Sequence, residues 1–369
     1  MIIGIPREIK TAEHRIALTP DGVIELVAHG HEVLVEAGAG EGSSIHDDDY
    51  VAAGARMVSA AEAWGAAMVV KVKEPQESEF AFLRADQTLF TYLHLAAYPK
   101  VADALLSAGT TAVAYETVQL ENHALPLLAP MSEVAGRMAT QVGAHFLERA
   151  HGGRGVLLGG APGVRPARVV VLGAGNVGWN AAWIAQGMEA EVLLLDKDLD
   201  RLRWVDQIHQ GRIMTLASNR AAVERAVAEA DLVIGAVLVA GGRAPQVVSE
   251  AMVRAMKKGA VIVDVAVDQG GCVATTHETT HDNPVYEVGG VLHYAVGNMP
   301  GAVPHTSTYA LTNATLPYVE ALATDGLRSA AWAHPELLGG VTAVAGAVTQ
   351  PAVAQALGRP FVDPRTALG

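Results

Sequence analysis

The chain has 369 residues, 50% of them hydrophobic, and carries a formal net charge of −13 with a pI near 5.5. This length predicts about two globular domains, and the acidic balance argues against nucleic acid or an anionic membrane surface as a partner. The single cysteine, Cys272, excludes an intramolecular disulfide and a cysteine-based zinc site.

Targeting signals and metal motifs are both weak. No apolar run approaches the roughly 18 residues of a transmembrane helix, and the N-terminal residues lack the layout of a signal peptide, so we expect a cytoplasmic protein. Fourteen histidines are present, and the segment His277-Glu278-Thr279-Thr280-His281 has the H-E-x-x-H pattern, which binds zinc when a helix brings both histidines to one face. His277 and His281 are four residues apart in a Thr- and Asp-rich segment that is typical of a loop. We therefore predict no catalytic metal site, and binding of a metal ion at a non-catalytic site stays an open question.

The first part of the chain alternates between strand-like and helix-like segments. Helical spacing begins near Pro20, Ser59 and Pro99. Such alternation predicts a parallel sheet with helices on both faces. The expected strands, which are apolar and rich in β-branched residues, are Ile2–Ile5, Glu32–Glu36, Met68–Val72, Thr88–Leu93 and Thr111–Tyr115.

Pro126 to Pro130 marks a change of domain. Ser132 follows as a predicted N-cap, and apolar residues then recur every four positions, at Val134, Met138, Val142 and Phe146. This stripe predicts a buried helix near residues 131–150 that joins the two domains.

A glycine motif opens the second domain. The apolar run Val169 to Leu172 indicates a buried parallel strand, and Gly173, Gly175 and Gly178 follow it with the spacing G-x-G-x-x-G. An apolar helix comes next. The first glycine permits a sharp turn, the second lets a pyrophosphate approach the backbone, and the third allows close packing of helix and strand. The phosphates would lie at the helix N-terminus, so we predict dinucleotide binding.

Asp196 ends the next apolar strand, at about the 20-residue offset expected of a ribose-binding carboxylate. Its charge would repel a 2′-phosphate, which favours NAD over NADP as the cofactor. Lys197 and Arg201 lie close by and weaken that preference. The alternative is that Asp196 only caps the following helix.

The second domain continues with strands over Arg212–Leu216, Leu232–Val237, Val261–Val265 and His293–Val296, and a return helix over residues 304–324. Pro351 to Leu357 indicates a further short helix. We therefore predict an α/β protein with two Rossmann-like, doubly wound parallel-sheet domains and a cleft between them. Residues 1–126 and 305–369 would form a substrate domain, into which an NAD-binding domain of residues 127–304 is inserted.

Ligands of such sheets bind beyond the carboxyl ends of the strands, so polar residues at those ends are the candidates. Lys71 or Lys73 could meet a substrate anion, or both could be solvated charges. His94 is either a core histidine enclosed by apolar neighbours or an acid/base group.

Two further segments also allow more than one interpretation. Arg15 has a fork suited to a carboxylate, or it forms a surface salt bridge. Asp264 is a structural acid or a cap, whereas Asp268, before two glycines, is better placed to contact nicotinamide or substrate. These residues predict a nicotinamide-dependent oxidoreductase that acts on a small anionic substrate.

Taken together, the motifs resemble the L-alanine dehydrogenase family (alanine dehydrogenase and pyridine nucleotide transhydrogenase) over essentially the whole chain. The matching segments are Ile5-Pro-Arg-Glu, Gly38-Ala-Gly-Glu-Gly, Lys71-Val-Lys-Glu-Pro75, Leu93-His-Leu-Ala-Ala97, Met131-Ser-Glu-Val-Ala-Gly136, Asp264-Val-Ala-Val-Asp-Gln-Gly-Gly271, Asn298-Met-Pro-Gly and Thr306-Ser-Thr-Tyr-Ala-Leu-Thr-Asn-Ala-Thr315.

The resemblance implies reversible, NAD-dependent oxidative deamination of L-alanine to pyruvate and ammonium by a cytoplasmic homohexamer. It implies that Arg15 and Lys73 bind the substrate and that His94 and Asp268 are the acid/base pair. The implied cofactor-binding residues are Ser132, Gly173, Gly175, Asn176, Val177, Gly178, Asp196, Arg201, Ser218, Val237, Leu238, Asp268, Asn298 and Met299. The family often has lysine where Arg201 stands, so the contact geometry there is open.

Three other functions are compatible with parts of this pattern. A nucleotide-binding subunit of a transhydrogenase or a saccharopine-dehydrogenase-like enzyme would share much of the pattern. A non-catalytic NAD-sensing module would keep the glycine loop but would need none of the four residues assigned to substrate and chemistry.

Overall fold

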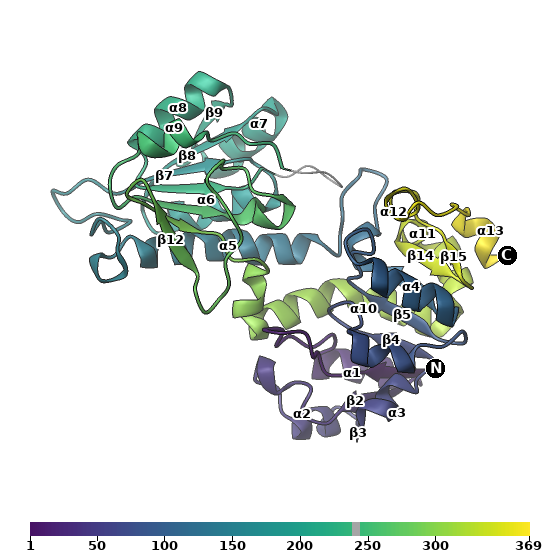
Figure 1. Ribbon diagram of the computed structural model, residues 1–369. Coiled ribbons are helices and arrows are strands. Elements are labelled where there is room, and N and C mark those ends of the chain that lie inside the picture. The colour runs from purple at the N-terminus through teal and green to yellow at the C-terminus, as the bar shows by residue number, and fades with distance from the viewer. Residues whose placement is uncertain (238–243) are drawn as a thin grey trace. The chain divides into compact units, whose positions relative to one another are not determined.

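The computed structural model describes residues 1–237 and 244–369, which divide into two compact units (Figure 1). Unit 1 consists of Met1–Met131 and Val303–Gly369, and unit 2 consists of Ser132–Ala302. Unit 2 is therefore an insertion in the sequence of unit 1. Leu238, one of the expected cofactor residues, lies outside the described residues.

Unit 1 is built on an eight-stranded sheet with the order β15-β14-β6-β5-β4-β1-β2-β3. The six strands from the N-terminal part are mutually parallel, and β14 and β15 extend the sheet with antiparallel pairing. The strands are β1 (Ile2–Ile5), β2 (Glu32–Glu36), β3 (Arg56–Val58), β4 (Met68–Val70), β5 (Thr88–Thr91), β6 (Thr111–Ala114), β14 (Val341–Val344) and β15 (Ala347–Val348).

Several helices of unit 1 begin after a residue whose side chain caps them. The Thr19 side chain accepts a hydrogen bond from the Gly22 amide, and Ser59 accepts one from Glu62 in a capping box. The helices are α1 (Pro20–Ala28), α2 (Asp47–Ala52), α3 (Ala60–Trp64), α4 (Pro99–Ala108), α10 (Pro304–Ala333), α11 (Leu337–Gly340), α12 (Pro351–Leu357) and α13 (Pro364–Leu368), with 3-10 turns at Glu41–Ser43, Glu77–Phe82 and Tyr115–Thr117.

Unit 2 has a seven-stranded sheet with the order β12-β13-β11-β10-β7-β8-β9, parallel except for β12. The chain runs outward from β7 to β9 and then returns to β10 on the other side of β7. This reversal is the switch point at which such sheets bind ligands. The strands are β7 (Arg168–Leu172), β8 (Glu191–Asp196), β9 (Met214–Ala217), β10 (Leu232–Gly235), β11 (Val261–Asp264), β12 (Val285–Val288) and β13 (Val291–Tyr294).

The central strands of unit 2 are buried because helices cover both faces of the sheet, as expected for a doubly wound fold. Val169, Val170 and Val171 are 0% exposed, as are Val261 and Ile262. The two parallel-sheet units confirm the predicted fold class. The helices are α5 (Ala129–Phe146), α6 (Asn176–Gly187), α7 (Leu199–His209), α8 (Arg220–Glu229) and α9 (Glu250–Arg254), with 3-10 turns at Arg149–His151, Val265–Gln269 and Met299–Ala302.

Several predicted boundaries need correction. Helix α5 begins at Ala129, so Ser132 lies inside its first turn and is not its N-cap. Helix α10 continues beyond residue 324 to Ala333, with a break at Gly326, whose φ of 73° is not helical. The edge strand β3 was not predicted because it has only three residues, of which Val58 alone is buried. The hairpin strand β12, none of whose residues is fully buried, was missed for a similar reason.

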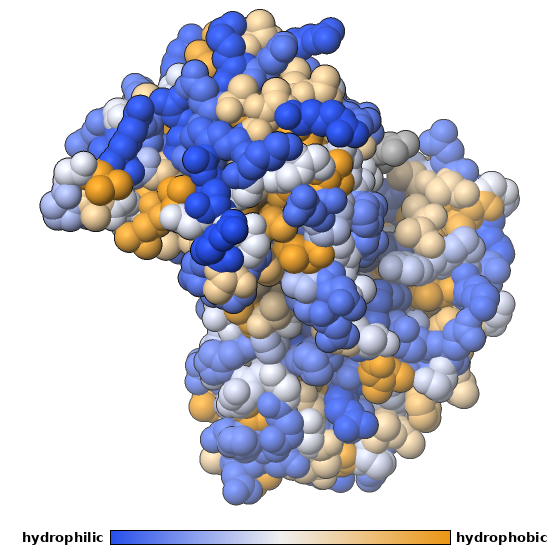
Figure 2. Space-filling model, turned by 60° about the vertical axis from the view of Figure 1, so that its left-hand side comes forward, coloured by the Kyte–Doolittle hydropathy of each residue, from blue (hydrophilic) through white to orange (hydrophobic). Residues whose placement is uncertain are grey.

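The surface mixes polar and apolar residues, as Figure 2 shows for one face. Large exposed apolar side chains in unit 2 include Trp183 on α6, Trp204 and Ile208 on α7, and Met214 on β9. Among the described residues, no helix combines the length and the apolarity that are needed to cross a membrane.

Candidate active site

Three neighbouring parallel strands of unit 1 place the substrate candidates at one edge of the sheet. Strand β4 pairs with β1 on one side and with β5 on the other, so the carboxyl ends of all three strands lie together. Arg15 follows β1, Lys73 follows β4 and His94 follows β5. The topology therefore gathers residues that are up to 79 positions apart in the sequence.

Arg15 is buried, and its guanidinium is held by Glu13. Its Nε donates to Glu13 Oε1 at 2.7 Å and its Nη2 donates to Glu13 Oε2 at 2.5 Å, while Nη1 lies 3.0 Å from the sulfur of Met131. Burial acts to raise the pKa of the Glu13 carboxyl, but the hydrogen bonds and charge of Arg15 outweigh it and lower that pKa to about 2. The prediction that Arg15 forms only a surface salt bridge is wrong, and a substrate carboxylate would share the guanidinium with Glu13.

The two lysines after β4 have different environments. Lys71 is 0% exposed, and its ammonium lies 3.1 Å from both Glu8 Oε2 and Glu79 Oε1. Lys73 is partly buried, and within the described part of the chain no carboxylate oxygen lies within 4.0 Å of its ammonium. Burial and the charge of Arg15 lower the pKa of Lys73. Lys71 is thus part of a buried ion-pair cluster, and Lys73 is the lysine suited to an added anion.

His94 is not enclosed by its apolar neighbours, and that alternative is wrong. Its side chain is 42% exposed and its φ is 46°, because the chain turns sharply after β5. The ring stacks in parallel on Tyr92, with 5.9 Å between ring centroids. An exposed imidazole at a strand end is available for proton transfer.

Glu116 holds the His94 turn in place, and sequence reasoning missed it. Its Oε1 accepts a hydrogen bond from the His94 amide at 2.6 Å, its carboxylate also accepts from the Leu93 amide, and Oε1 lies 3.8 Å from His94 Nδ1. Glu116 follows β6, the neighbour of β5. The same rule that selected His94, a polar residue just after a strand, would have found it.

Tyr92 was also missed, because its sequence context is that of a core aromatic residue. It is 3% exposed, and its hydroxyl donates to the Leu127 carbonyl at 2.5 Å. Burial raises its pKa, whereas the nearby charge of Arg15 lowers it and that of Glu116 raises it. Tyr92 is therefore a neutral side chain that stacks on the His94 ring and lies near the charge of Arg15.

In unit 2 the three motif glycines have three distinct structural roles. Gly173 has a φ of 101°, and a Cβ there would lie 2.5 Å from the Ala236 carbonyl oxygen. A Cβ on Gly178 would lie 1.8 Å from the Gly173 carbonyl oxygen. Gly175 is different, because the nearest atom to a Cβ there would be Nη1 of Arg201, at 3.7 Å. The loop is thus tightly packed on its inner side and open at its middle glycine.

Helix α6 begins directly after this loop, at Asn176. Its N-cap, Gly175, supplies no side-chain cap, so the amides of the first turn can hydrogen-bond to an added anion. Val177 lies in that turn, and its carbonyl packs against Gly136 of α5 so closely that a Cβ on Gly136 would come within 2.2 Å of the oxygen. These features fit the phosphates of a dinucleotide.

Hydrogen bonds of Asp196 connect the glycine loop to the segments that follow β8 and β9. Its Oδ2 accepts from the Ala174 amide at 2.5 Å and its Oδ1 accepts from the Asp198 amide at 2.8 Å. Its carbonyl accepts from the Ser218 amide, also at 2.8 Å. Arg201 projects from α7, with Nε 3.5 Å from Asp198. Asp196 does not cap α7, since Asp198 does so, and the cap alternative is therefore wrong.

The segment after β11 separates a structural carboxylate from an exposed one. Asp264 is 1% exposed and accepts hydrogen bonds from the amides of Ala266, Cys272 and Val273, and burial raises its pKa. Asp268 is exposed, and a Cβ on Gly297 would lie 3.1 Å from its Oδ1. Asp264 is therefore a structural acid, whereas Asp268 lies at the surface.

The remaining cofactor candidates of unit 2 within the described residues are Asn298, Met299 and Val237. Asn298 follows Gly297 and has a φ of 55°. Met299 is 3% exposed and Val237 is partly buried. The structure thus brings together Gly175 with Arg201, Asp196 with Ser218, and Asp268 with the Gly297–Asn298 turn, while His94 and Asp268 belong to different units.

Comparison with known proteins matches nearly the whole chain. Residues 4–135 match the family described as alanine dehydrogenase/PNT, N-terminal domain, and residues 139–351 match the corresponding C-terminal domain. The alanine dehydrogenase of Mycobacterium tuberculosis (strain H37Rv) is 55% identical over 100% of both chains. That of Bacillus subtilis (strain 168) is 54% identical over 100% of this chain and 98% of its own.

Solved structures agree with these matches. An L-alanine dehydrogenase superposes with a TM-score of 0.95 at 53% identity, covering 97% of this chain and 99% of the other. A transhydrogenase from Sinorhizobium meliloti superposes with a TM-score of 0.82 at 28% identity, covering 95% and 100%. The chain therefore belongs to the alanine dehydrogenase/PNT family.

Proposed function

We propose that this chain catalyses the reversible, NAD-dependent oxidative deamination of L-alanine to pyruvate and ammonium. The observation that carries the proposal is the identity of 54–55% over essentially full length to proteins named alanine dehydrogenase. The set of polar groups at the carboxyl edge of the unit 1 sheet supports a small amino-acid substrate.

Arg15 and Lys73 would hold the substrate. Both are cationic side chains on the same sheet edge, and Lys73 has no carboxylate partner within the described residues, so an added carboxylate would offset the cost of its partial burial. Glu13 fixes the guanidinium of Arg15 in one orientation. Holding the substrate in a single orientation is worth several kcal/mol in favourable systems.

His94 would act as the base. Hydride can leave the alanine Cα only when the amine is neutral, because its lone pair stabilises the developing iminium. An imidazole can take the proton from the ammonium and then activate the water that attacks the iminium carbon. Glu116 and the Tyr92 ring would position His94 for both steps. Asp268 would be the second acid/base group.

Unit 2 would bind NAD. When bound, the nicotinamide accepts the hydride. The open backbone at Gly175 and the uncapped start of α6 fit the pyrophosphate, and Asp196 at the end of β8 fits the ribose hydroxyls. The residues that we propose to line the cofactor are Ser132, Gly173, Gly175, Asn176, Val177, Gly178, Asp196, Arg201, Ser218, Val237, Leu238, Asp268, Asn298 and Met299.

The proposal also includes a cytoplasmic homo-oligomer, a hexamer by resemblance to the family. Light scattering coupled to size-exclusion chromatography would measure its mass. A mass of one 38.4 kDa chain would contradict the oligomer without affecting the assigned reaction.

The test is the oxidation of NADH by pyruvate, with and without ammonium. We expect turnover only when pyruvate and ammonium are both present, with alanine as the product. Oxidation of NADH by pyruvate alone would point to simple keto-acid reduction. Hydride exchange between two nucleotides without either substrate would favour the transhydrogenase alternative, and NADH binding without turnover would favour a sensing module.

A further inference from the structure

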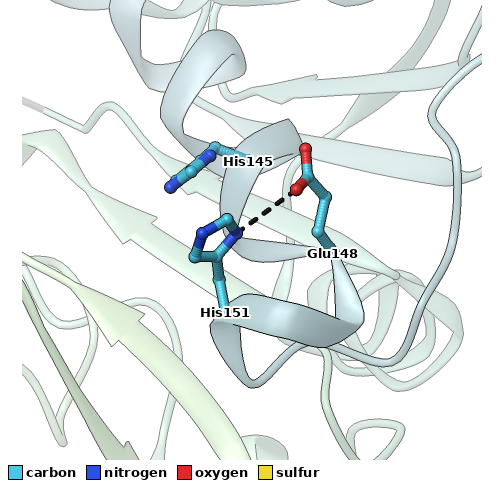
Figure 3. A group of neighbouring side chains, drawn as sticks. All are labelled: His145, Glu148 and His151. Carbon is cyan, nitrogen blue, oxygen red and sulfur yellow. Dashed lines mark ion pairs between the residues drawn. The ribbon is translucent and has the colours of Figure 1, made fainter.

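The end of helix α5 carries a cluster of potential metal ligands outside the proposed active site. His145 is the penultimate residue of α5, Glu148 follows two residues after the helix ends, and His151 ends the next 3-10 turn. All three side chains are exposed, and each ligand atom lies within 4.8 Å of the others. Figure 3 shows the three side chains grouped together at the end of α5 and the turn that follows it.

The backbone brings these side chains together by a regular spacing. The Glu148 amide donates to the His145 carbonyl at 3.2 Å, and the His151 amide donates to the Glu148 carbonyl at 3.1 Å. Residues i and i+3 eclipse one another in such turns. The three-residue spacing of His145, Glu148 and His151 therefore places them on the same side of the chain.

The turn is also anchored to the core, which fixes the backbone of the cluster. Leu147 is 0% exposed, and its carbonyl accepts from the Gly155 amide at 2.8 Å. The Glu148 carbonyl also accepts from the Gly153 amide at 3.0 Å. These hydrogen bonds anchor the backbone that carries the three exposed side chains.

His151 already contacts both Glu148 and His145, and a metal ion would link the same three side chains. His151 Nδ1 lies 3.3 Å from Glu148 Oε2, and the two imidazole rings lie 3.8 Å apart at an angle of 34°. In a tetrahedral zinc site, bonds of about 2.0–2.2 Å separate neighbouring ligand atoms by about 3.3–3.6 Å. The ligand atoms of the cluster, all within 4.8 Å of one another, would have to move closer together by about 1 Å on binding the ion.

From this geometry we propose that His145, Glu148 and His151 form a binding site for a divalent transition-metal ion, with Zn²⁺ as its best-suited occupant. Two imidazoles and one carboxylate are a common zinc donor set and leave a fourth position for water. The bound ion would tie the end of α5 to the following turn and stabilise unit 2. This inference does not depend on the proposed dehydrogenase activity.

The test is calorimetric titration of Zn²⁺ into the whole chain after treatment with EDTA. We expect one ion per chain at this site and a loss of affinity of at least about tenfold in His145→Ala and in His151→Ala, which equals about 1.4 kcal/mol. Zinc should also raise the thermal unfolding midpoint of the wild type more than that of either variant.

A matched control is His29→Ala, which disrupts the second cluster of potential ligands, Glu25, His29 and Glu320. It should leave the zinc affinity and the thermal shift unchanged. Because His145 and His151 are exposed, their variants should unfold at the wild-type temperature in EDTA, which separates a lost ligand from a lost fold. Unchanged zinc binding in both variants, or a loss of binding only in His29→Ala, would overturn the proposal.

Discussion

The carboxyl edge of the unit 1 sheet and the glycine loop of unit 2 both lie at the ends of parallel strands, yet they are built by opposite means. The unit 1 edge consists of charged and aromatic side chains from four strand ends, such as Arg15, Lys73, His94 and Glu116. The unit 2 loop consists of backbone, and its key residues are those without a side chain, such as Gly175.

The difference has a physical reason in the proposed ligands. A dinucleotide offers phosphates that amides and a helix N-terminus can bind, so closeness of the backbone is what matters. A small amino acid offers one carboxylate and one amine, so it needs individually placed charges. We therefore expect side-chain changes in unit 1 to affect chemistry and substrate, and backbone changes in unit 2 to affect nucleotide binding.

The largest effect is expected from the proposed base. His94→Ala should reduce kcat for alanine oxidation by about 10²–10⁴, the usual contribution of general acid–base catalysis. Glu116→Gln, which keeps an acceptor for the His94 amide but removes the charge, should reduce kcat by less. Steady-state kinetics would measure both variants, and near-normal turnover of His94→Ala would remove His94 from the mechanism.

A second large effect is expected on stability from Glu13→Gln. This change removes the carboxylate charge that lies against the buried guanidinium of Arg15, and breaking comparable buried pairs costs about 3–5 kcal/mol. Denaturant unfolding at pH 7 would measure the loss of free energy. Lys71→Met is a useful comparison, because it breaks the other buried cluster, with Glu8 and Glu79, without changing the proposed substrate groups.

The pH dependence of the same variant sharpens this prediction. The pKa of Glu13 is lowered from 4.5 to about 2 by its hydrogen bonds and charge interaction with Arg15, against the effect of burial. The carboxylate thus contributes stability that is present above pH 4.5 and is lost as the pH falls toward 2. The difference in unfolding free energy between wild type and Glu13→Gln should shrink over this window, and a constant difference would contradict it.

Two glycines of unit 2 form a matched pair with different expected outcomes. Gly178→Ala places a Cβ against the Gly173 carbonyl oxygen, and should destabilise unit 2 by about 1–3 kcal/mol or more. Gly175 has a φ of −75°, and a Cβ there would make only an ordinary van der Waals contact, 3.7 Å from Nη1 of Arg201, so Gly175→Ala should fold normally. Equal thermal unfolding of both variants would contradict the packing role of Gly178.

The smallest effect is expected on cofactor choice. Asp196→Asn keeps an oxygen that can accept from the Ala174 amide but removes the charge that would repel a 2′-phosphate. The preference for NAD over NADP, measured as a ratio of kcat/KM, should fall by about tenfold, since a hydrogen bond to a charged group is worth about 1.5–3 kcal/mol. An unchanged ratio would mean that another residue reads the ribose.

The same comparison explains what the sequence could predict. The glycine loop, β7 and Asp196 are contiguous in sequence, and their spacing carries the information, so the strand, the turn and the following helix were all predicted in the right places. Strands β1 and β2 were predicted residue for residue, because each contains three consecutive buried residues that are mainly apolar. The edge strands β3 and β12 carry no such signal.

The unit 1 edge could be predicted only in part, because its contacts join distant residues. Glu13 is only two residues from Arg15, but the local pattern does not indicate a bidentate pair, and Met131, which lies against the guanidinium, is 116 residues away. The choice between Lys71 and Lys73 depends on Glu8 and Glu79, which local pattern does not reveal. Site residues were therefore identified by position at strand ends, and their partners came from the fold.

The most direct test of this division between the units is to measure NADH binding by His94→Ala and Gly175→Ala, with nucleotide fluorescence as the signal. We expect His94→Ala to bind NADH with the wild-type affinity and Gly175→Ala to bind it at least about tenfold more weakly, a difference of about 1.4 kcal/mol. Loss of NADH binding in His94→Ala together with unchanged binding in Gly175→Ala would contradict the account.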